Sequence, residues 1–391
     1  MTGSLENYQD EIYLTGNPPV LPADLSQLEE LASRRMTSTA FGYIRGGAGT
    51  GDTVRENAEA FRRWRIVPSM LTDVSAVSYR SSVLGTELSF PLLLGPVGVL
   101  RLAHQDGELA VARVAGELGV PMVLSTAASC TMEEVAAACG SGPRWYQLYW
   151  PKDRSVAESL IGRAAAAGFS VLMVTLDTRL LGWRPVDLDA AYLPFLRGIG
   201  IQNYLSDPVF CAGLPEPLSS HQDQAVLRWA QMFGDPSLTW ADLPWLRSVW
   251  DGPIVLKGIM SVADAVRAVD AGMDGIVVSN HGGRQVDGGL AALDALPGVA
   301  ARVGSELTVL FDSGVRSGAD VLKAVALGAR AVLIGRPYAY GLGLAGEDGV
   351  RHVLRALRTD FEITMRLAGL ASLSELDPDV LVRHRRRPGP G

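Results

Sequence analysis

The sequence has few of the features that mark metalloproteins, disulfide scaffolds and membrane proteins. Its only cysteines, Cys130, Cys139 and Cys211, form no CxxC pair and show no metal-ligand spacing. This predicts buried thiols in a reducing compartment and no metal site. No apolar run reaches the roughly 18 to 20 residues that a membrane helix needs, and the opening MTGSLENYQDEIY is polar and acidic. We therefore expect a cytoplasmic protein that does not contact a membrane.

Positive charge is also scarce. The chain has 35 Lys and Arg against 42 Asp and Glu, a formal net charge of -7, and no basic stripe is dense enough to follow nucleic-acid phosphates. The one basic run, Arg383 to Arg387, lies beside Pro and Gly near the C-terminal end. Because termini are usually poorly ordered, we expect a solvated tail over residues 377–391. The composition, 48% hydrophobic, is that of a folded protein.

What the sequence does have is an alternation of strand-like and helix-like segments. Short apolar runs, typical of parallel strands buried on both faces, occur at residues 91–98, 121–126, 145–150, 171–177, 253–258, 275–280, 308–314 and 331–336. Helix-like segments between them, such as SVADAVRAVDAG, end in the glycine expected just past a helix. Eight units in roughly 270 residues predict an α/β fold, a (β/α)8 TIM barrel, better than an open doubly wound sheet.

The remaining segments complete the predicted organisation. We expect residues 1–90 to form an N-terminal helical segment and cap, and residues 91–376 to form the barrel. The stretch from about residue 180 to 250 is too long for a plain connection after the fourth strand. Insertions of this kind are usually lids or binding loops, so we predict a lid here.

Polar residues stand at the ends of the predicted strands. The active site of a TIM barrel lies at the C-terminal ends of its strands. In chain order, the residues there are Gly95 to Gly98, Ser125, Gln147 with Tyr149, Thr175 with Asp177, Lys257, Ser279 to His281, Asp312, and Gly335 with Arg336. A barrel of purely structural purpose has no need to gather so many costly polar groups at one mouth. We therefore predict a catalytic site there.

The last two strands carry the signature of a phosphate site. DSGVRSGADVLKAVALGA and IGRP provide glycines, a helix N-terminus, and Arg316 or Arg336 for charge. Phosphate sites of TIM barrels commonly follow strands seven and eight. There is no GxGxxG after an early strand and no GK[ST] motif, which excludes the usual dinucleotide and P-loop signatures. The sequence thus predicts a phosphorylated cofactor.

Taken in order, these motifs resemble one family. SNHGGRQVDGG, VLKG, QLYW, TLDTRLLGWR, DSGVRSGADVLKA and IGRP are similar to the FMN-dependent α-hydroxy acid oxidases and dehydrogenases, over residues 6–376. ENYQDEIY, LGWRP and YLPFLRGIGIQNYLSDPVF resemble the lactate 2-monooxygenase subgroup, including its long lid. The resemblance implies bound FMN, oxidation of an L-2-hydroxy acid to the 2-oxo acid with O2 as acceptor, and a homo-oligomer, commonly a tetramer.

The resemblance also implies roles for individual residues. His281 would take a proton as reducing equivalents leave the substrate α-carbon, and Asp177 would stabilise the imidazolium. Arg284 and Arg184 would hold the substrate carboxylate, for which a guanidinium fork is well shaped. Lys257 would stabilise the negative charge of reduced flavin.

Two tyrosines and a set of cofactor ligands complete the predicted site. Tyr43 and Tyr149 would form hydrogen bonds with the substrate carboxylate and hydroxyl. Residues implied to contact FMN are Val97, Gly98, Ser125, Gln147, Thr175, Lys257, Ser279, Asp312, Gly314, Arg316, Gly335 and Arg336.

Two positions depart from other family members. Many oxidases have alanine at the position of Gly98, so glycine predicts extra room beside flavin N5. Ala127 stands where glycolate oxidase has tryptophan, which predicts space for a substrate larger than lactate. Lid residues that could refill this space are Tyr192, Phe195, Leu196 and Tyr204.

Several outcomes stay open. A lid that retains the oxo acid would let peroxide decarboxylate it, the monooxygenase outcome, whereas early opening would release oxo acid and H2O2, including from a larger or aromatic substrate. A dehydrogenase that passes electrons to a quinone or a protein is a further alternative. A non-redox barrel that binds FMN or phosphate is the alternative from another class, and the intact set of His281, Arg284, Lys257 and Asp177 counts against it.

Overall fold

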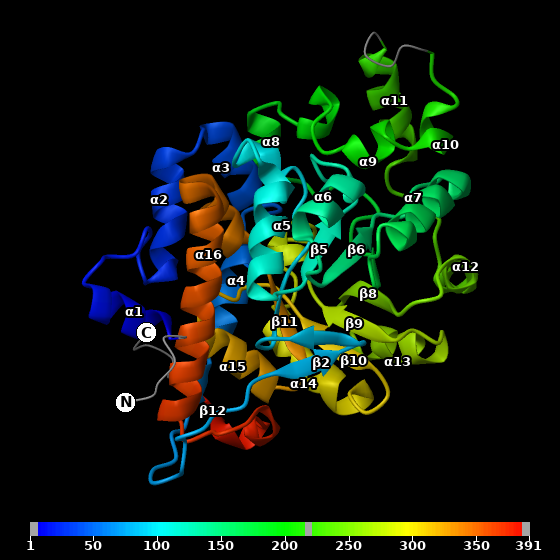
Figure 1. Cartoon of the computed structure of the whole chain (residues 1–391). Helices are drawn as coiled ribbons and strands as arrows, with labels where there is room; N and C mark the ends of the chain where they lie inside the picture. Colours follow the sequence, from blue (N-terminus) through cyan, green and yellow to red (C-terminus); the bar gives the residue numbers. More distant parts are fainter. Residues whose placement is uncertain (1–6, 216–220, 385–391) are drawn as a thin grey trace, which may run out of the picture.

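The structure is a computed structural model that describes residues 7–215 and 221–384. Its centre is a closed parallel barrel (Figure 1). The strands are β4 (Leu92–Leu94), β5 (Met122–Ser125), β6 (Arg144–Leu148), β7 (Leu172–Thr175), β8 (Ile254–Ile259), β9 (Gly275–Val278), β10 (Thr308–Phe311) and β11 (Ala331–Ile334). They pair in chain order, and β11 closes on β4. All overlap the predicted segments, so the (β/α)8 TIM barrel is confirmed.

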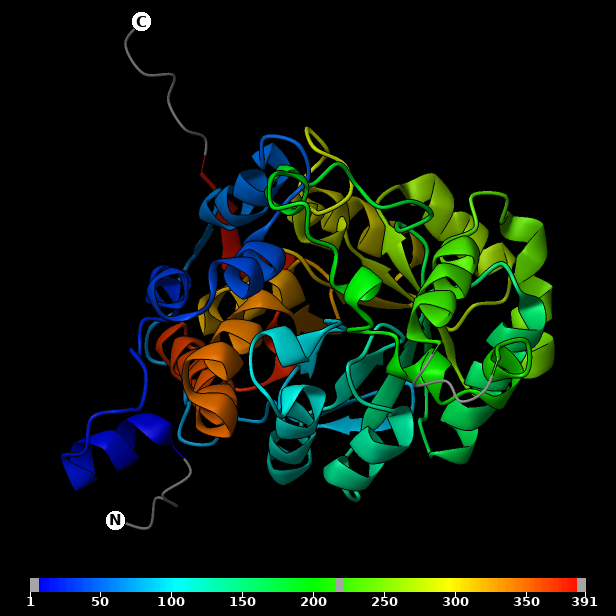
Figure 2. The same ribbon diagram turned by 90° about the horizontal axis from the view of Figure 1, so that it is seen from above.

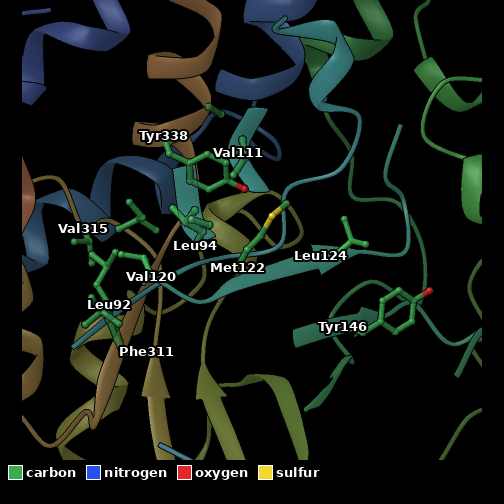
Figure 3. Close-up of a cluster of buried hydrophobic side chains, with 14 of the residues drawn as sticks. Leu92, Leu94, Val111, Val120, Met122, Leu124, Tyr146, Phe311, Val315 and Tyr338 are labelled. Carbon is green, nitrogen blue, oxygen red and sulfur yellow. The ribbon is translucent and has the colours of Figure 1, made fainter. Parts of the chain in front are cut away.

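The short strands are apolar on both faces because alternate residues enter two different cores. Leu93, Val123 and Met173 belong to a core inside the barrel. Their chain neighbours Leu92 and Leu124 belong to a larger core between the barrel and the outer helices, part of which is seen in Figure 3. This double burial explains why the strands read as continuous apolar runs instead of alternating ones.

Helices cover the outside of the barrel. They are α5 (Gly107–Leu118), α6 (Met132–Cys139), α7 (Arg154–Ala166), α13 (Val262–Asp270), α14 (Ala292–Val303), α15 (Gly318–Ala326) and α16 (Arg336–Leu367). Several begin at a capping side chain, since Thr131, Ser261 and Ser317 each accept a hydrogen bond from a backbone N–H of the first turn. Within residues 7–215 and 221–384, no helix is both long and apolar enough to span a bilayer.

The N-terminal segment contains helices and a small hairpin. The helices are α1 (Tyr8–Thr15), α2 (Leu28–Arg35), α3 (Ser38–Arg45) and α4 (Asp52–Arg62). The hairpin of β2 (Ser81–Val83) and β3 (Thr86–Leu88) lies directly before β4 and adds Val83 and Leu88 to the core inside the barrel. The Trp145 indole N–H, at the start of β6, donates to Thr86 Oγ1 at 2.9 Å. The hairpin therefore closes the barrel end opposite to the predicted active site.

The segment predicted as a solvated tail begins with ordered structure, which corrects that expectation. β12 (Leu381–Arg383) pairs antiparallel with β1 (Trp64–Ile66). Leu381 is buried, and the Arg383 guanidinium lies over the Trp64 ring, 5.8 Å from its centroid. A three-residue strand gives no periodic signal, so its distant partner decides the structure. The rest of the basic run, from residue 385 on, lies outside the described residues.

The predicted lid is inserted between β7 and β8 and lies at the C-terminal end of the barrel, green in Figures 1 and 2. Its described helices are α8 (Pro185–Asp189), α9 (Gln202–Leu205), α10 (Pro208–Cys211), α11 (Gln222–Met232) and α12 (Leu243–Val249).

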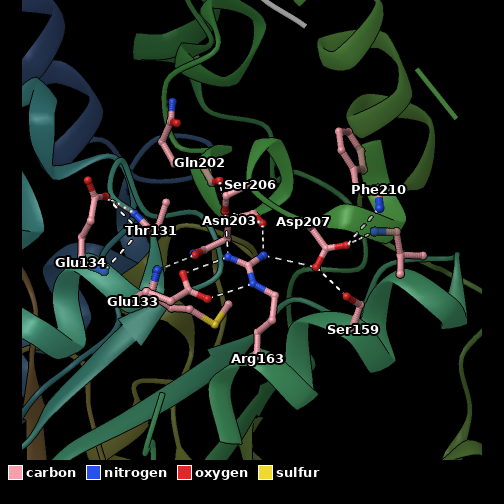
Figure 4. A network of polar contacts seen from close by, with 12 residues as sticks. Thr131, Glu133, Glu134, Ser159, Arg163, Gln202, Asn203, Ser206, Asp207 and Phe210 are labelled. Atoms are coloured by element: carbon pink, nitrogen blue, oxygen red, sulfur yellow. Dashed lines mark hydrogen bonds and ion pairs between the residues drawn. The ribbon is translucent and has the colours of Figure 1, made fainter. Parts of the chain in front are cut away.

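One side chain fixes α9 and α10 to the barrel helices. Arg163 of α7 donates to the Asn203 carbonyl oxygen at 2.7 Å and to Asp207 Oδ2 at 3.2 Å, and it also binds Glu133 (Figure 4). Asp207 is fully buried. The Asn203 side chain accepts a hydrogen bond from the Met132 backbone N–H at 2.8 Å. This end of the lid is thus tied to α6 and α7.

Candidate active site

A cavity of about 140 Å³ opens at the C-terminal ends of the barrel strands. The predicted site residues that line it are Tyr43, Val97, Gly98, Tyr149, Arg184, Lys257, His281, Arg284, Asp312, Gly314, Arg316, Gly335 and Arg336. The remaining predicted residues, Asp177, Ser125, Gln147, Thr175 and Ser279, do not line it. The structure therefore brings most of the predicted set to one cavity.

His281 and Asp177 form a hydrogen-bonded pair beside this cavity. His281 Nδ1 lies 2.7 Å from Asp177 Oδ1, and Thr178 Oγ1 donates to the same oxygen at 3.0 Å. His281 has a left-handed backbone, with φ of 58°, and its N–H donates to Ser279 Oγ at 3.1 Å. Because Nδ1 is engaged by a carboxylate, Nε2 is left as the proton acceptor of a neutral imidazole.

The charges of this pair suit a base. Burial lowers the pKa of His281, and the Asp177 carboxylate opposes that shift only in part. Burial alone would raise the pKa of Asp177, but the positive charges of His281 and Lys257 hold it below its ordinary value. At neutral pH the pair therefore consists of a neutral imidazole and an ionised carboxylate, which is ready to stabilise an imidazolium.

Lys257 supplies a buried positive charge in the same cavity. Lys257 is only 4% exposed. Its Nζ lies 3.0 Å from Asp312 Oδ2 and 2.9 Å from Ser279 Oγ. Burial would lower the pKa of Lys257, but Asp312 and Asp177 raise it above its ordinary value. The lysine is therefore charged, and it can stabilise negative charge that develops nearby.

Two arginines lie together on one wall. Arg284 Nη1 donates to the carbonyl oxygens of Tyr43 and Gly46, at 2.7 and 2.6 Å, and its guanidinium lies 5.1 Å from the centroid of the Tyr43 ring. Arg184 donates to the Arg284 carbonyl at 3.2 Å and to Gln285 Oε1 at 2.7 Å. Burial and the charge of Arg284 lower the pKa of Arg184 to about 10. Among the described residues, the acceptors of these hydrogen bonds are all neutral carbonyl or amide oxygens, so the wall favours a bound carboxylate.

Aromatic side chains of the lid face Tyr149. Burial, followed by the charge of Asp177, raises the pKa of Tyr149 to about 12, so its hydroxyl is protonated. Its ring packs against Phe233, with centroids 5.5 Å apart. Phe233 in turn lies 4.8 Å from Trp229 and 6.2 Å from Phe195. Phe195 and Phe233 both line the cavity, which gives it an apolar wall.

Of the four lid residues expected near Ala127, only Phe195 lines the cavity. Tyr204 is buried against Phe210, with ring centroids 5.5 Å apart, and Leu196 is 53% exposed. Tyr192 is half-buried and does not line the cavity either. Phe233 and Leu181 were not predicted from the sequence, because both lie in the long insertion, where no periodic pattern shows which side chains point toward the cavity.

Gly98 does not leave the open space that the sequence suggested. A Cβ at Gly98 would lie 2.8 Å from the Ala127 carbonyl oxygen and 2.9 Å from the Ala127 Cβ. The same carbonyl accepts a hydrogen bond from the Val99 N–H at 2.9 Å. Glycine is therefore required here because the loops after β4 and β5 pack closely, and Ala127 fills the space beside it.

The arginines at the predicted phosphate end differ in their contacts. Arg316 lines the cavity, and its Nη1 donates a hydrogen bond to the Val315 carbonyl oxygen at 2.8 Å. Arg336 donates to the carbonyl oxygens of Ile44, Gly282 and Gly46, at 3.1, 2.9 and 3.0 Å. Burial and the charge of Arg284 lower the pKa of Arg336 to about 9. Arg336 thus links the N-terminal segment to the His281 loop, and two of its five N–H groups make no hydrogen bond within the part of the chain that the structure describes.

A buried amide shows that the site fits a polar ring. Gln147 is fully buried, and its Oε1 accepts a hydrogen bond from Ser125 Oγ at 2.9 Å. Its Nε2 has no hydrogen-bond partner among the described residues. A buried N–H group without a hydrogen bond destabilises the fold, so we expect a bound ligand to place an acceptor atom beside Gln147 Nε2. Thr175 is the last residue of β7, which lies between β6, the strand of Gln147, and β8, where Thr175 pairs with Lys257. The carbonyl and nitrogen acceptors of a flavin ring fit this donor set.

Gln285 and Asp287 hold the His281 loop and were not singled out from the sequence. Gln285 Nε2 donates to the carbonyl oxygens of Asp177 and Leu180, at 2.8 and 2.9 Å. Asp287 accepts hydrogen bonds from the N–H groups of Thr50 and Thr53, and so caps α4, whose own N-cap is a glycine. Both residues belong to the SNHGGRQVDGG motif. The sequence around them does not show whether their side chains bind distant segments or point into solvent, as polar residues of a loop often do.

Comparison with known proteins agrees with this geometry. The model of the family described as FMN-dependent dehydrogenase matches residues 32–383. An FMN-dependent α-hydroxy acid dehydrogenase of Schizosaccharomyces pombe is 46% identical, over 96% of this chain and 96% of that protein. An L-lactate oxidase of Lysinibacillus sphaericus is 41% identical over 95% of each. A mandelate oxidase solved with (S)-4-hydroxymandelic acid superposes with a TM-score of 0.82 at 38% identity, covering 92% of this chain and 98% of that one.

Proposed function

The chain belongs to the FMN-dependent dehydrogenase family, and from this premise we propose that it oxidises an L-2-hydroxy acid to the 2-oxo acid, with O2 as the electron acceptor. The observation that carries the proposal is the His281–Asp177 pair, at 2.7 Å, beside the cavity that also holds Lys257, Arg184 and Arg284. A neutral base, a buried cation and two carboxylate-binding arginines suit a 2-hydroxy acid.

FMN supplies the ring that accepts the electrons. The residues proposed to hold the ring are Val97, Gly98, Ser125, Gln147, Thr175, Ser279 and Lys257. Those proposed for the ribityl chain and phosphate are Asp312, Gly314, Arg316, Gly335 and Arg336. The unsatisfied Gln147 Nε2 supports the ring position. Gly335 and Arg336, at the N-terminus of α16, line the same cavity together with Arg316 and support the phosphate position.

The side chains around the substrate have separate tasks. Arg284 and Arg184 hold the carboxylate, while the hydroxyl groups of Tyr43 and Tyr149 donate hydrogen bonds to the carboxylate and the substrate oxygen. His281 Nε2 accepts the proton that leaves the substrate. The Asp177 carboxylate then stabilises the imidazolium through Nδ1.

The aromatic wall supports a substrate with an apolar side chain. Phe195, Phe233 and Leu181 line the same cavity as the charged groups, and burial of an apolar substituent against them is favourable. A panel of small, bulky and aromatic 2-hydroxy acids, scored by the rate of anaerobic flavin reduction, tests this. Faster reduction by glycolate than by any acid with an apolar side chain would contradict it.

The fate of the product is a separate question. Retention of the 2-oxo acid beneath the lid leads to oxidative decarboxylation by peroxide, as in lactate 2-monooxygenase, whereas early release gives 2-oxo acid and H2O2. The Arg163 contacts that tie α9 and α10 to the barrel favour retention. Supplying L-lactate and O2 and measuring acetate, pyruvate and peroxide distinguishes the two. Pyruvate and peroxide in equal yield would establish the oxidase outcome.

Two rival functions have direct tests. Anaerobic bleaching of the bound flavin by a 2-hydroxy acid separates the proposed enzyme from a non-redox FMN or phosphate-binding barrel, which would show no bleaching with any such acid. Reoxidation of the bleached enzyme by O2, compared with a quinone, separates the oxidase from a dehydrogenase.

Location and assembly complete the proposal. We propose a cytoplasmic location, since the described residues contain no disulfide. We propose a homo-oligomer, a tetramer by family resemblance, and exposed apolar residues such as Trp183 (72%) and Val286 (67%) support an interface. Cell fractionation and light scattering on the purified protein test the two points.

A further inference from the structure

Residues 95–98, in the loop after β4, line the active-site cavity, whereas the next residue, Val99, is buried and does not line it. Val99 has a left-handed backbone, with φ of 53° and ψ of 36°. A β-branched residue rarely adopts this conformation, which costs free energy and persists only where surrounding contacts hold it. The contacts around Val99 therefore also determine where the cavity-lining part of the loop lies.

Buried polar side chains bind this loop at both ends. Tyr338 of α16, whose ring is seen in Figure 3, is 1% exposed, and its hydroxyl donates to the Gly95 carbonyl oxygen at 2.8 Å. At the other end, the Leu100 backbone N–H donates to Glu108 Oε1 at 3.1 Å. Glu108 belongs to the first turn of α5. Helices α16 and α5 thus each supply one side chain that holds the loop.

Glu108 also joins this loop to the loop after β5. The same Oε1 accepts a second hydrogen bond, from the Ser129 backbone N–H at 2.9 Å. Ala127, two residues earlier in that loop, accepts the Val99 N–H and packs closely against Gly98. One carboxyl oxygen therefore fixes both of the loops that meet at Gly98.

A carboxyl group at this position is costly. Glu108 is fully buried, and the other buried residues of α5 are glycine, alanine and valine. Its Oε2 makes no hydrogen bond within the part of the chain that the structure describes. Burial raises the pKa of Glu108, although the N–H groups of Ser129 and Leu100 oppose the rise. An apolar side chain would fill the space without this cost, so what residue 108 provides is the acceptor Oε1.

We propose that Glu108 is a positioning residue for the flavin, which holds residues 95–99 in the one conformation that places Val97 and Gly98 against the ring. The role rests on the proposed function, which puts the ring at these two residues. Glu108 does not line the cavity, so it acts only through the backbone of the two loops. Without its acceptor the strained turn relaxes, and the apparent affinity for FMN falls with the fraction of molecules that keep the competent conformation.

Three substitutions of Glu108 separate its acceptor from its charge and its bulk. Glu108→Leu keeps the bulk but removes the acceptor. Glu108→Gln keeps an acceptor, since its amide oxygen can replace Oε1, but it cannot ionise. Glu108→Asp keeps the carboxyl group on a shorter side chain, a milder change that serves if the leucine variant does not fold.

Thr86→Val is the matched control. It also removes a buried acceptor, because Thr86 is 5% exposed and accepts the Trp145 indole N–H at 2.9 Å. This contact lies at the barrel end opposite to the active site, so its loss destabilises the fold without reaching the flavin. Each variant is studied as the FMN-loaded enzyme. Thermal unfolding at saturating FMN measures stability, and the fluorescence of flavin released on dilution gives the Kd for FMN.

We expect Glu108→Leu to raise the Kd for FMN by about tenfold, equivalent to about 1.4 kcal/mol, as the competent fraction falls to about one in ten. Glu108→Gln should bind FMN as the parent enzyme does, and Glu108→Asp should lie between the two. Thr86→Val should lower the unfolding temperature and leave the Kd unchanged.

Three results would overturn the proposal. They are an unchanged Kd in Glu108→Leu, an equal rise in Thr86→Val, and a rise in Glu108→Gln as large as that in Glu108→Leu, which would assign the effect to charge. If the leucine variant does not fold, equal affinities of Glu108→Asp and Glu108→Gln would overturn it. The Kd is measured without substrate. A flavin that no 2-hydroxy acid reduces would therefore refute the proposed function and leave the test of Glu108 intact.

Discussion

Gly258 packs its bare Cα against the carboxylate of Asp177. Its φ of 107° is one that L side chains rarely adopt, and an added Cβ would lie 2.9 Å from both the Asp177 Cβ and Oδ2. Gly258 directly follows Lys257 on β8, so the strand that carries the buried cation also leaves room for the carboxylate that supports His281. The position of the base thus depends on the absence of a side chain one strand away.

We predict that Gly258→Ala slows flavin reduction by about tenfold or more, because displacing Asp177 removes part of the contribution of a general base. The rate is measured by anaerobic stopped-flow absorbance. Gly272→Ala is the matched control, since Gly272 also has a positive φ, 68°, but no atom within 4 Å of an added Cβ. An equal slowing in both variants would assign the effect to backbone strain instead.

His281→Ala should bind FMN as the parent enzyme does and reduce it about 10² to 10⁴ times more slowly, the usual contribution of a general base. The flavin is expected to stay because His281 lines the cavity beside the predicted substrate position. Absorbance of the purified variant gives the flavin content, and stopped flow gives the rate. Near-normal reduction would remove His281 from the role of base.

The pH dependence follows from the lowered pKa of His281. Burial lowers the pKa of His281 below the ordinary 6.5, so its imidazole is neutral around pH 7 and able to accept a proton from the substrate. The profile of kcat/KM should therefore have its acid midpoint below 6.5, with activity lost as the pH falls. Asp177→Asn removes a charge that raises the pKa of His281, so the midpoint should move further down and the rate should fall. A wild-type midpoint above 6.5 would contradict this assignment.

The same shifts affect stability with a fixed sign. The pKa values of His281 and Asp177 are both lower in the folded state than their ordinary values. The unfolded chain thus binds protons more readily, and stability is lost as the pH falls, first below about 6.5 for His281 and then below about 4 for Asp177. Their contributions are fully present at neutral pH.

The barrel and its polar mouth could be predicted because both are local features of the sequence. Each strand is a short apolar run, and residues such as Lys257, His281 and Asp312 stand where a run ends. Since all parallel strands end at the same side of the barrel, position along the chain is enough to bring them to one mouth. No knowledge of side-chain packing is needed for that step.

The parts that escaped prediction depend on contacts between distant segments. β12 exists because β1 offers an edge, and Asp287 caps a helix more than two hundred residues earlier in the chain. The glycine at position 98 predicted open space beside its Cα, but the Ala127 carbonyl group occupies the place that a Cβ would take. Phe233 reaches the cavity from the end of α11 through a lid whose path no periodicity specifies.

Phe233→Ala should widen the substrate pocket next to Tyr149. We expect kcat/KM for an aromatic acid such as mandelate, relative to L-lactate, to rise by about tenfold, the usual scale of discrimination in an apolar pocket. Leu196→Ala is the control, because Leu196 belongs to the lid but is 53% exposed. A ratio that is unchanged in both variants would show that another wall limits substrate size.

Arg163→Met tests the anchoring of the lid. The change leaves Asp207, which is fully buried, without its cation, and unpaired buried charges cost about 3 to 5 kcal/mol. Thermal unfolding should therefore occur at a lower temperature, whereas Arg302→Met, which breaks a pair with side chains 50% and 46% exposed, should change stability by less than about 1 kcal/mol. A looser lid should also release the 2-oxo acid earlier, so the share of pyruvate and peroxide formed from L-lactate should rise. If both variants unfold alike and give the same products, α9 and α10 are held by their apolar packing and not by Arg163.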